Sequence, residues 1–281
     1  MFPLYVALVS ETNAIPASEV NRVAAALQKQ AVRDFEPIWN VRALVSAFST
    51  LEDVPLGYWP IIVRDDIGFP GAAGIHLDKD GQPFALVMSG SHWSLTASHE
   101  LLEMLADPFG NRLIAGTSPK PDQGRVEFLV EVCDPSEAVA FAYQVNGIVV
   151  SDFYTPHYFD PVGTAGIRYS YTGAITKPRE VLKGGYLSWH EPVTNHWWQF
   201  QFFSGKGRFV DLGVFTAIKE SLRAMIDGMT VVPARVESQN PKTAFTMATF
   251  AAEASLQEPA QSKASSWHEQ IEVLKATYSP E

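Results

Sequence analysis

The residues best suited to chemistry lie together in one apolar segment, residues 98–107. His99, Glu100 and Glu103 stand in the order His-Glu-x-x-Glu, and Asp107 comes directly before a proline. In a helix, His99 and Glu103 lie on one face, about 6 Å apart along the axis. That spacing allows an imidazole and a carboxylate to bind one metal ion. Glu100 then lies beside them, where a general base for a metal-bound water is needed.

Zinc catalysis requires three protein ligands and one open coordination position for water. The ion lowers the pKa of that water and polarises the carbonyl group under attack, while a carboxylate takes the proton. We therefore expect His99 and Glu103 to be ligands of Zn²⁺, with calcium or another divalent ion as the alternative, because glutamate also suits those ions.

The third metal ligand has to come from elsewhere in the chain. Glu131, on a predicted strand at residues 125–134, is the preferred candidate, and Asp134 is an alternate that could instead orient a ligand. Asp107 is a second alternate, but it lies roughly 12 Å from His99 along an ideal helix. We expect Asp107 to bind either local backbone or a second site of its own. We expect Cys133 to be an inert buried thiol, although its acidic neighbours permit a soft-metal role.

A second group of candidates lies at residues 151–161, which are dense in tyrosine, histidine and aspartate. His157 is either a metal ligand or a group that stabilises the oxyanion of a tetrahedral intermediate. Tyr154 or Tyr158 is expected to donate a proton to that oxyanion. The other interpretation of this segment is an aromatic loop packed on the core.

The composition limits the class of protein. The chain has 281 residues, 46% of them hydrophobic, which is enough for one large domain or two small ones. A formal net charge of -10, from 31 acidic and 21 basic residues, argues against nucleic acid and anionic membranes as partners. The single cysteine excludes an internal disulfide and the Cys-rich zinc sites.

No apolar run reaches the roughly 18 residues that cross a bilayer. The first residues predict a strand and not a signal peptide, so we expect a cytoplasmic protein. The sequence carries no indication of its oligomeric state.

Hydrophobic periodicity over the first 110 residues predicts alternating strands and helices. The expected elements are a strand at 4–9, a helix at 16–34, strands at 41–49 and 57–63, a hairpin of 73–77 with 84–88, and a helix at 93–106. The segment Asp78 to Gly81 is typical of a hairpin turn. Pro108 ends the last helix.

This order resembles the N-terminal subdomain of the zincin metallopeptidases. Residues 34–39, 98–103, 107–108, 131–134 and 146–147 ahead of Tyr154 resemble a group of poorly characterised bacterial zincin-like proteins. The part from His99 to Pro108 is distantly similar to the plant exordium-type proteins. The resemblance implies a metal-dependent hydrolase in which a mixed sheet carries the active-site helix and an antiparallel edge strand borders the substrate cleft. The chain departs from the zinc-protease signature at Glu103, where that signature has a second histidine.

We therefore predict an α+β fold in three parts. Residues 1–110 form the zincin- or metzincin-like subdomain, and residues 111–233 form a β-rich, aromatic subdomain that completes the site. Residues 234–281 form a peripheral tail, helical or partly disordered. Within the second part we expect β structure at 125–134, 141–150 and 166–171, an aromatic stretch at 186–203, and a helix at 210–226.

Three hypotheses about function follow from these predictions. The first is a zinc-dependent metallopeptidase that cleaves a peptide bond in a peptide or protein substrate, with Glu100 as the general base. The alternative is a non-catalytic binding or structural protein in which the ion fastens the helix to residues 125–134. A metal hydrolase acting on an amide or a sugar conjugate is a third, weaker hypothesis.

Overall fold

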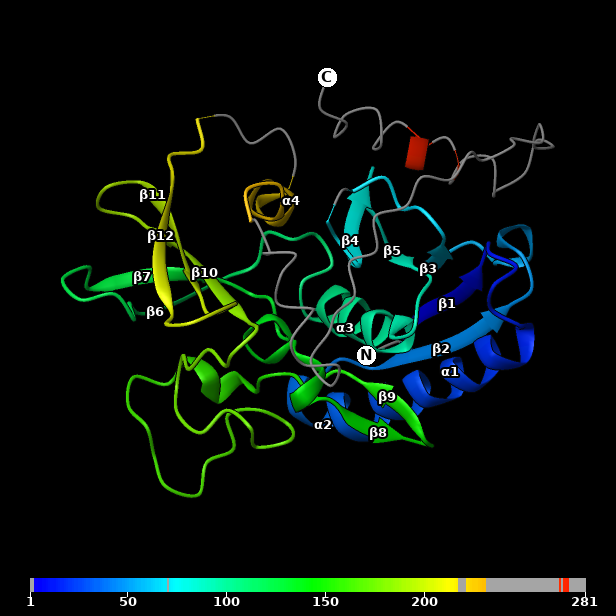
Figure 1. Cartoon of the computed structure of the whole chain (residues 1–281), viewed down its shortest axis with the longest axis horizontal. Coiled ribbons are helices and arrows are strands. Elements are labelled where there is room, and N and C mark those ends of the chain that lie inside the picture. Colours follow the sequence, from blue (N-terminus) through cyan, green and yellow to red (C-terminus); the bar gives the residue numbers. More distant parts are fainter. Residues whose placement is uncertain (1–2, 70, 217–220, 231–267, 269, 273–281) are drawn as a thin grey trace.

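The computed structural model of the chain describes residues 3–69, 71–216, 221–230, 268 and 270–272. They form a mixed α+β fold with two five-stranded sheets. The sheets lie at opposite ends of the long axis, and one central helix, α3 (Trp93–Ala106), lies between them (Figure 1). The expected α+β class is therefore confirmed at this level.

The first sheet has the strand order β2-β1-β3-β5-β4. Its strands are β1 (Leu4–Ser10), β2 (Ala43–Phe48), β3 (Tyr58–Arg64), β4 (Gly74–Lys79) and β5 (Gln82–Met88). Four strands run parallel, and β4 pairs antiparallel with β5 at the edge. The predicted hairpin is present, and both turn residues, Asp80 and Gly81, have a positive φ, as a tight hairpin turn requires.

Helices cover one face of this sheet. α1 (Ala17–Lys29) buries Val20, Val23 and Leu27, spaced three and four residues apart, in the same core as the buried side chains of α3. α1 continues as a π-helical segment, Gln30–Phe35, and as the short α2 (Glu36–Trp39). The opposite face has its own smaller core, which includes Ile271 near the C-terminus.

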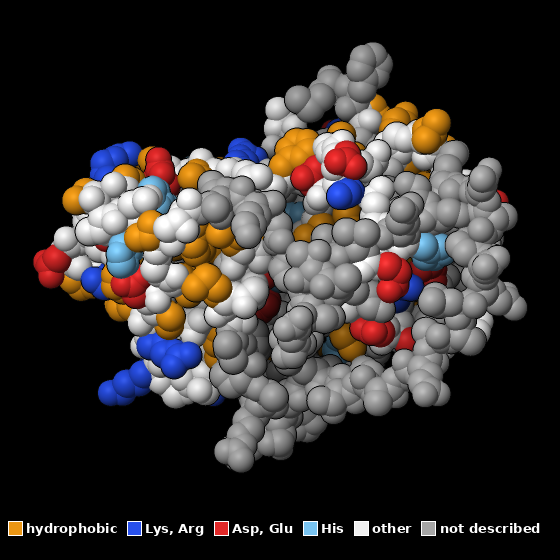
Figure 2. Space-filling model, turned by 90° about the horizontal axis from the view of Figure 1, so that it is seen from above, with side chains coloured by type: hydrophobic (Ala, Val, Ile, Leu, Met, Phe, Trp, Pro, Cys, Tyr) orange, Lys and Arg blue, Asp and Glu red, His pale blue; other side chains and the backbone are white. Residues whose placement is uncertain are grey.

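The second sheet is antiparallel, with the order β12-β11-β10-β7-β6. Its strands are β6 (Leu113–Thr117), β7 (Arg125–Leu129), β10 (Tyr186–Glu191), β11 (His196–Gln201) and β12 (Arg208–Gly213). A separate hairpin joins β8 (Tyr143–Val145) to β9 (Ile148–Val150), and α4 (Leu222–Asp227) follows the sheet. Seen from above, hydrophobic side chains are exposed on the half that this sheet forms (Figure 2).

Short 3-10 turns complete the described elements. They span Leu51–Asp53, Asp134–Ser136, Val139–Phe141 and Pro156–Phe159.

Three predicted elements differ from the structure. The helix expected at 210–226 is wrong: its first part belongs to β12, because β11 supplies a partner strand and Gly213 takes a left-handed φ of 82°. Among the described residues of that range, the helical ones are 222–226, which belong to α4. The strand expected at 125–134 ends at Leu129, and β10 pairs only with Glu127 and Phe128 of it. Beyond Leu129, the backbone oxygen of Val132 accepts a hydrogen bond from the N–H of Tyr154 instead.

The strand expected at 166–171 is reduced to one isolated bridge between Tyr154 and Ser170. The tail predicted at 234–281 lies outside the described residues, apart from 268 and 270–272. None of the helices within the described ranges is long and apolar enough to cross a membrane.

Candidate metal centre

The His-Glu-x-x-Glu segment lies on α3, which is buried along almost its whole length. All of its residues except Ser94 are buried, and the side chains of His99, Glu100 and Glu103 point into the interior and not into solvent. Burying a charged group is costly unless it is paired or binds a cation. The partners of these three side chains therefore decide what the site can do.

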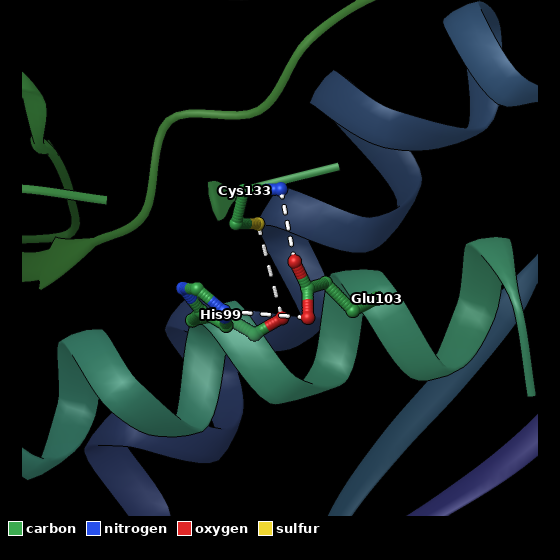
Figure 3. Close-up of side chains that lie close together, drawn as sticks. All are labelled: His99, Glu103 and Cys133. Atoms are coloured by element: carbon green, nitrogen blue, oxygen red, sulfur yellow. Dashed lines mark hydrogen bonds and ion pairs between the residues drawn. The ribbon is translucent and has the colours of Figure 1, made fainter. Parts of the chain in front are cut away.

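His99 faces two carboxylates at once. Its Nε2 atom lies 3.3 Å from Oε2 of Glu103, one helical turn on (Figure 3). The same atom lies 3.1 Å from Oδ1 of Asp134. A tetrahedral zinc ion with bonds of 2.0–2.1 Å holds its ligand atoms about 3.3 Å apart. The distance between Nε2 of His99 and Oε2 of Glu103 therefore fits two ligands of one ion, whereas Asp134 forms a separate group of ligand atoms with His99 and Glu137.

Cys133 brings a sulfur atom to the same place. Its Sγ lies within 4.8 Å of the ligand atoms of both His99 and Glu103, and all three residues are buried. Its backbone N–H donates to Oε1 of Glu103 over 3.1 Å, and this bond orients the carboxylate (Figure 3). Burial raises the pKa of the thiol well above its ordinary value, so Cys133 becomes a thiolate only beside a cation.

Asp134 lies closer to His99 than Glu131 does. Asp134 opens the 3-10 turn Asp134–Ser136, which turns its carboxylate back toward α3. Neither oxygen of Asp134 accepts a hydrogen bond from the residues placed in the structure. Burial, and after it the charge of Glu103, raise the pKa of Asp134. A buried carboxylate in this condition is suited to a cation.

Glu131, the preferred third ligand from the sequence, is buried but belongs to none of the groups of ligand atoms around His99. Both of its oxygens also lack a hydrogen bond within the described part of the chain. Burial and the nearby charge of Asp134 raise its pKa well above the ordinary value. Because β7 ends before Glu131, this residue is not carried to His99 by a strand.

The other side of Glu103 is formed by His76 on β4. The Nε2 atom of His76 lies 3.0 Å from the backbone oxygen of Asp107, and its Nδ1 atom lies 3.5 Å from Oε2 of Glu100. The distance from Nδ1 to Oε2 of Glu103 is 3.9 Å. His76 is therefore a further member of the cluster, on the edge strand of the predicted hairpin.

Arg223 on α4 supplies the guanidinium of the cluster. It pairs with Oε2 of Glu103, lies 3.5 Å from Oε2 of Glu100, and bonds Asp227 over 3.2 Å. Burial alone would raise the pKa of Glu103, but the charges of Arg223 and His99 hold it below its ordinary value. Sequence reasoning missed Arg223; its only local signal is the Arg-x-x-x-Asp spacing on a short helix.

A glycine allows β4 to approach α3 at this point. A Cβ atom on Gly74 would come 2.7 Å from Oε1 of Glu100 and 2.5 Å from Cγ2 of Thr96. The edge strand thus lies directly over the predicted general base. Any larger residue at this position would displace the Glu100 carboxylate.

The remaining sequence candidates take different positions. Tyr154 is fully buried and stacks on Tyr158 at 4.4 Å between ring centroids, and its hydroxyl makes no hydrogen bond among the described residues. His157 is 55% exposed and bonds Asp160, so it does not share the burial of the cluster. Asp107 accepts a hydrogen bond from the backbone N–H of Arg112, the local role expected for it.

Comparisons with known proteins give no family for this chain. No family model, no curated protein and no solved structure matches it significantly. The function therefore has to be argued from the cluster itself.

Proposed function

We propose that this protein is a metal-dependent hydrolase of the zincin type that cleaves peptide bonds with a zinc ion. The observation that carries the proposal is the group formed by His99, Glu103 and Cys133. Its nitrogen, oxygen and sulfur donors lie within 4.8 Å of one another, and Asp134 approaches the same imidazole. Calcium is a poor fit for this group, because calcium takes oxygen ligands.

In the proposed site, His99 and Glu103 are two ligands and the Cys133–Asp134 pair supplies the third. The bound ion would activate a water and polarise the substrate carbonyl. Glu100 is the proton acceptor: it follows His99 directly on α3, and its Oε2 is buried without a hydrogen bond from the described residues. The guanidinium of Arg223 lies 3.5 Å from the same oxygen.

The topology supports a peptide as the substrate. β4 is an antiparallel strand at the edge of an otherwise parallel sheet, and it packs on α3 beside Glu100. An edge strand offers free backbone groups to an extended peptide. This is the arrangement expected of a zincin-like subdomain, and the fold of residues 1–110 is proposed as such.

Tyr154 is the proposed donor to the developing oxyanion. Its buried hydroxyl has no hydrogen-bond partner within the described residues. Burial, and after it the neighbouring Tyr158 and the charges of Glu103 and Glu131, raise the pKa of this hydroxyl well above its ordinary value, so it keeps its proton. A preorganised donor stabilises a tetrahedral intermediate. His157 has no role in this proposal because its side chain is largely exposed.

We also propose a cytoplasmic location for the protein. Its proposed partner is a peptide or protein substrate, and neither nucleic acid nor a membrane.

The test combines metal content with peptide hydrolysis. Elemental mass spectrometry should find zinc and protein in equimolar amounts in the purified chain. The variant His99→Ala should contain no zinc. Glu100→Gln should keep that zinc and lose at least about 10²-fold in peptide cleavage, since general-base catalysis contributes this much or more. Asp134→Asn and Cys133→Ser should weaken zinc binding more than Glu131→Gln. Full cleavage by Glu100→Gln would overturn the mechanism.

One observation favours a second function, a non-catalytic protein in which the cluster only stabilises the fold. Arg223 already supplies a cation to Glu103 and Glu100. A structural ion then fastens α3 to the segment after β7 and no peptide is cut. In that case Glu100→Gln leaves every activity unchanged, and zinc removal lowers only the melting temperature.

A further inference from the structure

We infer that the protein has a second divalent-cation site, formed by Nδ1 of His76, Oε2 of Glu100 and Oε2 of Glu103, in which Glu103 is shared with the first ion. These three residues are buried, and their ligand atoms lie within 4.8 Å of one another. The inference extends the proposed metal centre through the shared Glu103, but it does not require that the protein be a hydrolase.

The orientation of His76 is the first argument. A carbonyl oxygen only accepts, so the contact of Nε2 with the backbone oxygen of Asp107 fixes the proton on Nε2. The lone pair of Nδ1 therefore points at Glu100 and Glu103. Metal-binding histidines almost always donate their other N–H to a carbonyl or carboxylate in this way. His76 is arranged as a ligand and not as a core histidine with both nitrogens satisfied.

The second argument is the lack of any donor at Nδ1. His76 is 2% exposed, and Nδ1 makes no hydrogen bond with the residues that the structure describes. The same holds for Oε2 of Glu100. These atoms lie 3.5 Å apart, which is longer than the roughly 2.8 Å of a charge-assisted hydrogen bond. The separation is close to that of two ligands of one ion.

Charge is the third argument. Glu100 and Glu103 are both buried, and the guanidinium of Arg223 lies against both of them. Arg223 also bonds Asp227, so its single positive charge is shared among three carboxyl groups. Buried carboxylates without a full counter-charge are costly, and a divalent cation between His76 and Glu100 would supply the missing positive charge.

Because Glu103 is shared between the two sites, a second ion would affect the activity of the first. Oε2 of Glu103 lies 3.3 Å from the nitrogen of His99 and 3.9 Å from that of His76, so one oxygen faces both positions. An ion between His76 and Glu100 makes Glu100 a ligand and removes it as a proton acceptor. It also competes with Arg223 for the same two carboxylates. Zinc in excess should therefore inhibit the hydrolysis that the first zinc supports.

The test is a titration of the metal-free full chain with Zn²⁺, followed by calorimetry and by elemental analysis after desalting. The wild type should bind two zinc ions per chain, the second more weakly. His76→Ala and the polar variant His76→Gln should each bind one. His196→Ala is the matched control and should bind two, because His196 pairs with Asp211 on the second sheet. Circular dichroism establishes that each variant is folded.

The outcomes separate the two proposals. Two ions in the wild type and one in both His76 variants support the second site, even when no peptide is cleaved. A wild type that cleaves peptide with a single ion at any zinc concentration overturns the second site and leaves the hydrolase proposal standing. Two ions retained in both folded His76 variants also overturn it.

Discussion

Glu103→Gln is the change that tests the buried cluster most directly. Glutamine has the same shape and can still accept from the backbone N–H of Cys133, but it carries no charge for Arg223. Breaking a buried ion pair by removing one partner costs about 3–5 kcal/mol. Glu100 remains 3.5 Å from the guanidinium and Asp227 remains bonded to it, so we expect the lower end of that range.

The magnitude is large enough to measure by thermal unfolding. A loss of about 3 kcal/mol lowers the melting temperature of a protein of this size by roughly 6–12 °C. Calorimetry in the presence of a chelator measures this loss without a metal contribution. The matched control is Glu127→Gln, which removes a carboxylate that is 42% exposed and pairs with His190. The control should cost less than about 1 kcal/mol.

Equal and small effects of the two variants would refute the reasoning. They would mean that Glu103 carries no net charge in the metal-free protein, or that Arg223 finds an equally good partner without it. Either result would remove the charge balance from which the second cation is inferred. A large loss in Glu103→Gln alone would support a charged interior held by Arg223.

Two further predictions concern the surroundings of the cluster. Gly74→Ala should lower stability by about 1–3 kcal/mol, because its Cβ would clash with Thr96 and Glu100 and overpacking carries that cost. Gly90→Ala is the control and should cost less, because nothing lies within 4 Å of a Cβ atom there and Gly90 does not have a positive φ. Burial, only partly offset by Arg223, raises the pKa of Asp227 to about 7, so protonation stabilises the folded state. This stability is present below the unfolded pKa and is lost as pH rises from about 4 to 7. In denaturant titrations with chelator, Asp227→Asn should therefore lose stability less steeply than the wild type over this window, and parallel profiles would contradict the assignment.

The strands of the first sheet and helix α3 can be predicted from sequence patterns within each element. The hairpin of β4 and β5 is predicted from one turn and two apolar runs, and α3 from its period and Pro108. Neither His76 nor Arg223 could be found in that way. Their roles come from side chains that meet Glu103 across 27 and 120 residues of chain, and no periodicity within a single element reports such a contact.

In the second sheet, local sequence patterns also fail to predict the backbone, because strand pairing between distant segments decides it. Residues 210–226 have apolar positions at a helical spacing, yet residues 208–213 pair with β11 instead. Tertiary pairing overrides local preference wherever a neighbouring strand has an open edge. The choice of Glu131 over Asp134 has the same origin, because a strand continuing past Leu129 was needed to bring Glu131 to α3. The positions of both acids depend on where the ladder stops.

The Arg223–Glu103 contact joins two residues that leave the ribosome at different times. Glu103 leaves the ribosome 120 residues before Arg223 does, at a stage when β10, β11 and β12 have not yet been made. During synthesis, domains form from the N-terminus onward. For that interval the acidic helix has no arginine to neutralise it.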